Sequence, residues 1–254
     1  MLSLLFMLLV LLGCEGNSSS PLVFEQGFVI ESQADIEELA RRGGSAYVIE
    51  GDLQIVGSDL VSLRGLEGLR RVEGSLEVWF NDGLKNLQGL RGLTSVGAGL
   101  GSAEIMPLTA AGKPAHVVEG LMIFENPALQ SLAGLEGLLF VGGGLSIVSN
   151  ESLISLADMQ DLHRIDGSLD IWFNGALESL EGLQSLTQIR DFLEVSGNGV
   201  LATLDGLRGV RFVGADLIVS NNGLLTESAV RVFAEHLVAE GFTGAVVVEG
   251  NSGE

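Results

Sequence analysis

The chain has 254 residues, with 33 acidic and 13 basic side chains, and its formal net charge is −20. This balance excludes proteins that hold DNA, RNA or an anionic bilayer surface by charge, because like charges repel. The length is sufficient for one large domain.

The first segment is apolar. Residues 1–13 are too few to span a bilayer comfortably as a permanent helix, and Cys14, the only cysteine, follows them. The run from Leu11 to Cys14 resembles a bacterial lipobox. This resemblance implies a lipoprotein signal peptide over 1–13, lipidation of Cys14 and anchoring to a membrane. A plain secretory signal with an incidental cysteine is the alternative.

The residues after Cys14 bear on location. Glu15, not Asp, follows the cysteine, and for a lipoprotein this implies an outer-membrane or cell-surface location. Without lipidation the protein would be secreted. Residues 14–22 are polar and predict a flexible tether. A single domain is expected over 23–254.

The next segment predicts an N-terminal cap over 23–50. Ser32 and Asp35 are typical of a helix start, Ile36 and Leu39 give one apolar face, and Gly43 indicates the helix end. A strand is expected at 47–49. Such a cap would cover the apolar end of a repeat array.

Residues 51–225 repeat one pattern about every two dozen residues, which is typical of solenoids. Each unit begins with an apolar leading residue, and a second apolar residue follows two positions later, as in a half-buried strand. Each unit is therefore expected to supply one strand of a parallel sheet. The leading residues are Leu53, Leu76, Leu100, Leu121, Leu145, Leu169, Leu193 and Leu217.

An asparagine stands five residues after most leading residues. Asparagine carries both donors and an acceptor, so it can satisfy backbone groups where a strand ends. We predict a structural asparagine ladder, with Ser58 and Ile105 as exceptions. Its members are Asn81, Asn126, Asn150, Asn174, Asn198, Asn222 and Asn251.

Leucines three residues apart follow each asparagine, as from Leu84 to Leu93, and favour short 3₁₀ turns. The unit that begins at Leu100 departs from the pattern at Ser102 and Ile105. It predicts a looped or bulged repeat between Val96 and Val118.

A C-terminal cap is expected over 226–251. Thr226 can begin a helix, and Val230, Phe233 and Leu237 would share its buried face with Ala234. Val246 then begins a ninth strand.

With these motifs, the segment from Tyr47 to Ile55 resembles the receptor L domain family, the leucine-rich ligand-binding solenoids of the epidermal growth factor and insulin receptors. The resemblance covers roughly residues 24–251. It implies a right-handed, parallel β-helix-type, leucine-rich-repeat-like domain with helical caps at both ends.

The outward residues of the sheet form the candidate binding strip. Trp79 and Trp172 stand three positions after their leading residues, and the expected sheet points their rings to solvent, unless a loop covers them. Phe80 and Phe173 are expected in the core. The strip comprises Trp79, Phe124, Val148 and Trp172, flanked by Glu77, Asp170 and Glu194.

Candidate catalytic groups are few. Asp170 and Glu194 lie on neighbouring strands about 5 Å apart, a separation that a retaining glycosidase could use. Solvated surface carboxylates are the other interpretation. His116, His163 and His236 are scattered, and no spacing indicates a metal or cofactor site.

The sequence therefore predicts a non-enzymatic, surface-anchored module that binds a protein or a glycan through its sheet face. A polysaccharide-active enzyme and a purely structural envelope protein are the alternatives.

Overall fold

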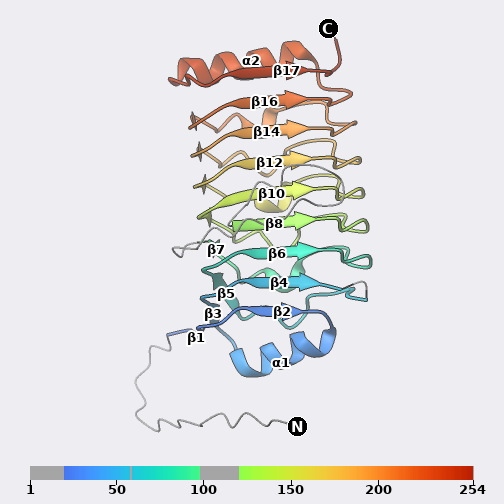
Figure 1. Cartoon of the computed structure of the whole chain (residues 1–254), viewed down its shortest axis with the longest axis vertical. Coiled ribbons are helices and arrows are strands. Elements are labelled where there is room, and N and C mark those ends of the chain that lie inside the picture. Colours follow the sequence, from blue (N-terminus) through green and yellow to red (C-terminus); the bar gives the residue numbers. More distant parts are fainter. Residues whose placement is uncertain (1–19, 58, 98–119, 254) are drawn as a thin grey trace, which may run out of the picture.

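The computed structural model describes residues 20–57, 59–97 and 120–253, and this part is built around two parallel sheets (Figure 1). The larger sheet has nine strands, in the spatial order β17, β16, β14, β12, β10, β8, β6, β4, β2. The leading residues pair in register, from Phe28 opposite Leu53 to Leu217 opposite Val246. The strands of this sheet are β2 Phe28–Ile30, β4 Leu53–Val56, β6 Leu76–Trp79, β8 Gly120–Phe124, β10 Gly144–Val148, β12 Leu169–Trp172, β14 Leu193–Ser196, β16 Leu217–Ser220 and β17 Val246–Glu249.

A second parallel sheet has eight strands, so the prediction of one strand per repeat is wrong. Most of these strands have two residues, which is too short to show an alternating pattern in the sequence. Their bounds are β1 Leu22–Phe24, β3 Tyr47–Ile49, β5 Leu69–Val72, β7 Ser95–Val96, β9 Phe140–Val141, β11 Arg164–Ile165, β13 Gln188–Ile189 and β15 Phe212–Val213.

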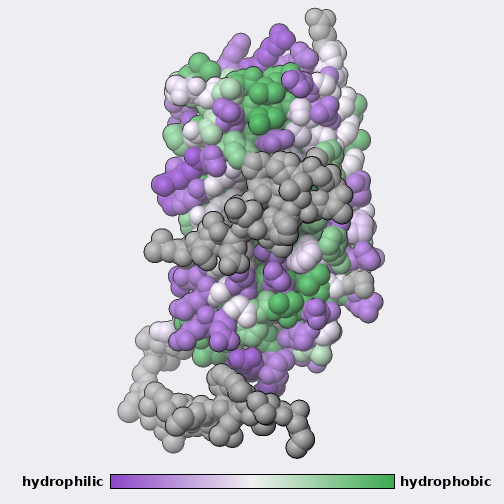
Figure 2. All heavy atoms as spheres, viewed as in Figure 1, coloured by the Kyte–Doolittle hydropathy of each residue, from purple (hydrophilic) through white to green (hydrophobic). Residues whose placement is uncertain are grey.

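The core contains the leucines of the return path together with the inward residues of both sheets. Leu84, Leu87, Leu90 and Leu93 are fully buried. Three returns contain the expected 3₁₀ turns, η1 (Gln88–Leu90), η2 (Ala157–Met159) and η3 (Asp205–Leu207). Two many-stranded parallel sheets with few helices are consistent with a parallel β-solenoid. Figure 2 shows hydrophobic and hydrophilic residues interspersed on the surface in the same view.

No strand of the expected repeat between Val96 and Val118 lies between the strands that precede and follow it in either sheet. β6 pairs directly with β8, with Leu76 opposite Leu121, and β7 pairs directly with β9. Residues 98–119, which include Leu100, Ser102 and Ile105, lie outside the described residues. Because the strands on both sides of this segment pair with each other, it is an insertion between β7 and β8. The spacing of Leu100 imitates the repeat in a chain rich in leucine.

The predicted asparagine ladder is confirmed. Each Nδ2 donates to the Oδ1 of the next asparagine at 2.9–3.3 Å, over six consecutive steps from Asn81 to Asn251. The backbone N–H of each donor residue also donates to that Oδ1, at 3.0–3.2 Å. The amide of Asn126 further donates to the carbonyl oxygen of Val78 in the preceding repeat, at 2.9 Å. The ladder thus satisfies backbone groups that the strand ends leave buried.

The residue before each ladder asparagine has a left-handed backbone, with φ between 50° and 72°. This conformation directs the side chain away from the interior, so Phe80 and Phe173 are 43% and 39% exposed. Their predicted place in the core is wrong for this reason. The seven positions are Phe80, Glu125, Ser149, Phe173, Gly197, Asn221 and Gly250.

Both predicted cap helices are present. α1 (Gln33–Gly43) begins at a capping box of Ser32 and Asp35 and buries Ile36 and Leu39. The Ser32 hydroxyl bound to Asp35 is the main cause that lowers the pKa of that carboxyl. α2 (Glu227–Ala239) buries Val230, Phe233, Ala234 and Leu237.

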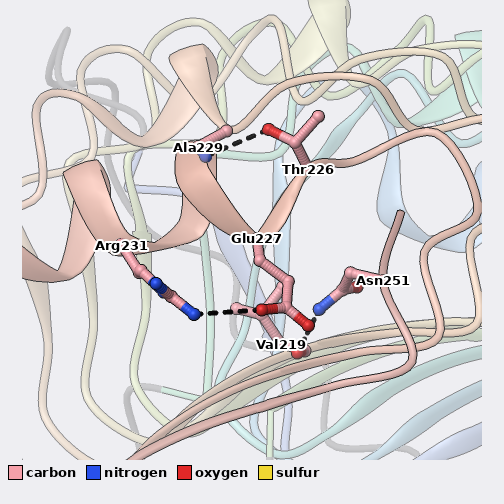
Figure 3. Close-up of polar contacts among 6 residues, drawn as sticks. All are labelled: Val219, Thr226, Glu227, Ala229, Arg231 and Asn251. Atoms are coloured by element: carbon pink, nitrogen blue, oxygen red, sulfur yellow. Dashed lines mark hydrogen bonds and ion pairs between the residues drawn. The ribbon is translucent and has the colours of Figure 1, made fainter. Parts of the chain in front are cut away.

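Polar contacts stabilise the C-terminal helix and the end of the ladder (Figure 3). The Thr226 hydroxyl accepts from the Ala229 N–H at 3.1 Å, and Arg231 pairs with Glu227 at 3.1 Å. At the end of the ladder, Asn251 Nδ2 donates to the carbonyl oxygen of Val219 at 2.8 Å.

Candidate binding face

The predicted strip is assembled by strand register. Trp79, Phe124, Val148 and Trp172 occupy directly opposed positions on β6, β8, β10 and β12. Neighbouring strands lie about 4.8 Å apart, so three steps give a row roughly 14 Å long. All four side chains are half-buried rather than open to solvent as the sequence predicted.

Phe80 extends the row toward the turn. Its ring centroid lies 5.0 Å from that of Trp79 and 5.7 Å from that of Phe124. The indole Nε1 of Trp79 is buried and has no hydrogen-bond partner among the described residues. The three rings therefore form one aromatic cluster, half-buried at its base and exposed at Phe80.

Phe173 takes the equivalent place beside Trp172. A Cβ added at Gly197 would lie 2.5 Å from the Phe173 ring, so this ring covers the end of the neighbouring strand. We call Trp79, Phe80, Phe124, Val148, Trp172 and Phe173 the aromatic strip. Sequence reasoning missed both phenylalanines. The signal was present, because their repeat position is elsewhere occupied by Gly197, Asn221 and Gly250, residue types that favour positive φ.

Carboxylates lie on the same face, one residue after three of the leading residues, at Glu77, Asp170 and Glu194. Glu77 is half-buried and accepts a hydrogen bond from Gln54 Nε2 at 3.1 Å. Burial, followed by the charge of Asp52, raises the pKa of Glu77. Glu194 Oε1 accepts from the Ser196 hydroxyl at 3.0 Å.

Asp170 is not a solvated carboxylate, contrary to the expectation. It is opposite Glu194 on the adjacent strand, yet only 1% exposed. Its surroundings on this face are also buried, including Ser146 and Ser168. Burial first, then the charges of Glu194 and Asp191, raise the pKa of Asp170 to about 7. Its buried Oδ1 has no hydrogen-bond partner in the described part of the chain.

A shallow hollow of about 570 Å³ lies elsewhere, where α1 meets the first returns. Arg70 closes one side of it and donates to the carbonyl oxygens of Glu67 and Ser45, both at 2.8 Å. These bonds connect β5 to the residues before it and to the segment that follows α1. The lining residues are Gly44, Ser45, Gly65, Glu67, Gly68, Arg70, Arg91 and Gly92.

The anchoring prediction concerns Cys14, which lies outside the described residues. Within residues 20–57, 59–97 and 120–253, no helix has the length and apolar character needed to cross a membrane. In the same ranges, no group of three or more His, Cys, Asp or Glu side chains is placed to hold a metal ion.

In comparisons with known proteins, no protein-family model, curated protein or solved structure matches the chain.

Proposed function

We propose that this protein is a non-enzymatic binding module that recognises a protein or a glycan through the aromatic strip. The observation that supports it most is the row of four large side chains on β6 to β12, with the exposed rings of Phe80 and Phe173 beside it. Exposed aromatic residues grouped on a regular face are typical of interaction sites.

The proposal includes a finer fold and a location. The chain would be a right-handed solenoid of the receptor L domain type. It would be lipidated on Cys14 and displayed at the outer membrane or cell surface. The two parallel sheets, the cap helices and the asparagine ladder support the solenoid. The location rests on the lipobox-like sequence alone. Mass spectrometry of the membrane fraction tests it, with Cys14→Ser as the variant that should be released.

A paired substitution tests the binding role. Trp79→Ala with Trp172→Ala should abolish binding on glycan and peptide arrays. The matched control is Phe140→Ala with Phe212→Ala, two aromatic residues from the outward row of the eight-stranded sheet. Two results would contradict the binding role of the tryptophans. One is an equal loss of binding in the tryptophan variant and in the Phe140 and Phe212 control. The other is a tryptophan variant that unfolds while the control stays folded, which would assign the tryptophans a structural role.

A polysaccharide-active enzyme is the second candidate, favoured by one observation. Asp170 has a raised pKa and lies opposite Glu194, and glycosidases use such unequal carboxylate pairs as acid and nucleophile. The 1% exposure of Asp170 places it out of reach of a polymer and favours the binding module. Hydrolysis of a polysaccharide that disappears in Asp170→Asn would reverse this preference.

A further inference from the structure

We infer that the ligand of the aromatic strip is a cationic protein segment, one that presents Arg or Lys side chains. This inference rests on the proposed function and narrows it from a protein or a glycan to one chemical class.

The charged side chains on the face that carries the aromatic strip are all acidic. Three rows of described side chains make up the outer face, one, three and four residues after the leading residues of β4 to β17. These rows contain no Lys, Arg or His. Their carboxylates are Glu77, Glu125, Asp170, Glu194 and Glu249.

Basic side chains lie elsewhere in the described structure. Arg70 and Arg71 lie in β5 and Arg164 lies in β11, while Arg190 and Arg211 adjoin other strands of the eight-stranded sheet. The remaining described basic residues belong to the cap helices and the return path. Among the described residues, the negative charge of the outer face is therefore separated from the basic side chains.

The outer-face carboxylates also lack internal counter-charges. Each ion pair found among the described residues joins groups outside the three rows. Asp170 is buried and out of reach, so the accessible carboxylates of this face are Glu77, Glu125, Glu194 and Glu249. An incoming cationic side chain would supply the charge that these carboxylates lack among the described residues.

The aromatic rings of the strip also favour a cationic ligand. The face of an aromatic ring carries negative potential and attracts guanidinium and ammonium groups. The ring centroid of Phe80 lies within 6 Å of those of Trp79 and Phe124, and Glu77 and Glu125 flank this cluster in sequence. Aromatic faces combined with carboxylates suit Arg or Lys better than a neutral sugar.

Two phenylalanines of the strip have a strained backbone conformation. Phe80 and Phe173 hold φ values of 55° and 54° and expose 43% and 39% of their surface. A bulky residue in the left-handed region is unfavourable, and exposure of its ring adds to the cost. Asn221, at the same repeat position with φ of 57°, shows the residue type that the turn itself accepts easily. The two phenylalanines are thus better explained by contact with a partner than by folding.

The test uses a fluorescein-labelled peptide of alternating Arg and Ser, and the same peptide with Glu in place of Arg. We expect the Arg peptide to bind and the Glu peptide not to bind. Raising NaCl from about 0.05 M to about 0.5 M should weaken binding roughly tenfold or more, because exposed charges are screened. Both tryptophans of the chain lie in the strip, so intrinsic fluorescence reports binding at this face.

Matched variants separate the strip from the overall charge. Phe80→Asn with Phe173→Asn keeps a residue suited to the turn and should weaken binding about tenfold, equivalent to two exposed cation–π contacts. Phe212→Asn, on the other sheet, should have no effect. Glu125→Gln with Glu194→Gln should weaken binding, whereas Glu178→Gln with Glu181→Gln, an equal change of net charge on the exposed return path, should not.

Two results would overturn the inference, and they differ in their consequence for the proposed function. If the Glu178→Gln and Glu181→Gln variant loses as much affinity for the Arg peptide as the Glu125→Gln and Glu194→Gln variant, the peptide is held by net charge alone. If the Arg peptide fails to bind while a neutral cello-oligosaccharide binds and is lost in the Phe80 and Phe173 variant, the ligand is a glycan. In that case the inference fails and the proposed function survives. Thermal unfolding of each variant confirms that it is folded.

Discussion

The residue before each ladder asparagine determines which side chain stands at the edge of the binding face. Its left-handed backbone points side chains outward, so it can hold a glycine, as at Gly197, or an exposed ring, as at Phe173. The neighbouring asparagine is fully buried. The same turn therefore places a buried ladder asparagine and the exposed ring of the strip next to each other.

Gly197 offers a direct test of this turn. Gly197→Ala should destabilise the protein by about 1–3 kcal/mol, because a Cβ is unfavourable at positive φ and would meet the Phe173 ring. The added atom would lie 2.5 Å from that ring. Gly199→Ala is the control, since nothing lies within 4 Å of its added Cβ. Chemical denaturation of both variants measures the difference, and equal stabilities would contradict this description of the turn.

Asp170 should make stability depend on pH. Its pKa is raised from 3.8 to about 7 in the folded protein, so the folded state binds the proton more tightly than the unfolded state. Stability attributable to this group is therefore greatest below about pH 4 and falls as pH rises toward 7, by up to about 4 kcal/mol.

Asp170→Asn removes this titration. The variant should be clearly more stable than the parent at pH 8, while the difference at pH 4 should be small. Asp82→Asn, at an exposed turn, is the control and should leave the pH profile unchanged. Unfolding measured between pH 4 and 8 checks the prediction, and a parent whose stability rises over this range would show that Asp170 is not held as described.

At the scale of the element, the ladder fixes the register of successive strands. A buried asparagine within it serves more neighbours than one at its end. Asn150 both donates to and accepts from other ladder residues, whereas Asn251 accepts from Asn222 and donates to Val219 only.

Asn150→Ala should therefore cost roughly 3–5 kcal/mol, since it leaves several buried backbone and amide groups unpaired. Asn251→Ala, at the half-buried end, should cost about 1 kcal/mol. Denaturant unfolding of the two variants compares them. A cost at Asn150 no greater than that at Asn251 would mean that the ladder does not carry the register.

The segment 98–119 gives a second prediction about elements. A Cβ added at Gly97 would lie 3.3 Å from the Cα of Gly120, so the ends of the insertion are adjacent. Replacing 98–119 by a short Gly-Ser link should change stability by less than about 1 kcal/mol, or roughly 2–4 °C in Tm. A deletion variant that fails to fold would show that the segment is needed between β6 and β8.

Sequence periodicity predicted the elements that carry a long-range repeat. The leading residues and the ladder follow from the repeat, and both cap helices follow from local start and stop signals. Most of the eight-stranded sheet does not, because its two-residue strands cannot display a period, and the exception is the strand at 47–49. The spacing of Leu100 predicted a repeat whose strand is not found between β6 and β8, because spacing alone cannot show which strands pair. The half-burial of Trp79 and Trp172 and the full burial of Asp170 depend on neighbours across strands, which no single repeat reveals.

At the scale of the whole molecule, the two sheets differ in chemistry. The nine-stranded sheet presents aromatic rings and carboxylates without basic residues. Arginines of the eight-stranded sheet pair with acids beside them, as Arg164 and Arg190 do with Asp166 at 2.7 and 2.9 Å. Charge that is balanced on one side and unbalanced on the other gives the molecule one preferred face for an oppositely charged partner.

The claim that this face is the binding surface is tested most directly by NMR of the tryptophan side chains. The chain has two tryptophans, Trp79 and Trp172, so its spectrum should contain two indole N–H signals, both from the aromatic strip. Titration with the Arg peptide, or with any ligand found on the arrays, should shift both signals in proportion to the bound fraction. Binding that calorimetry detects while both indole signals stay in place would contradict the account.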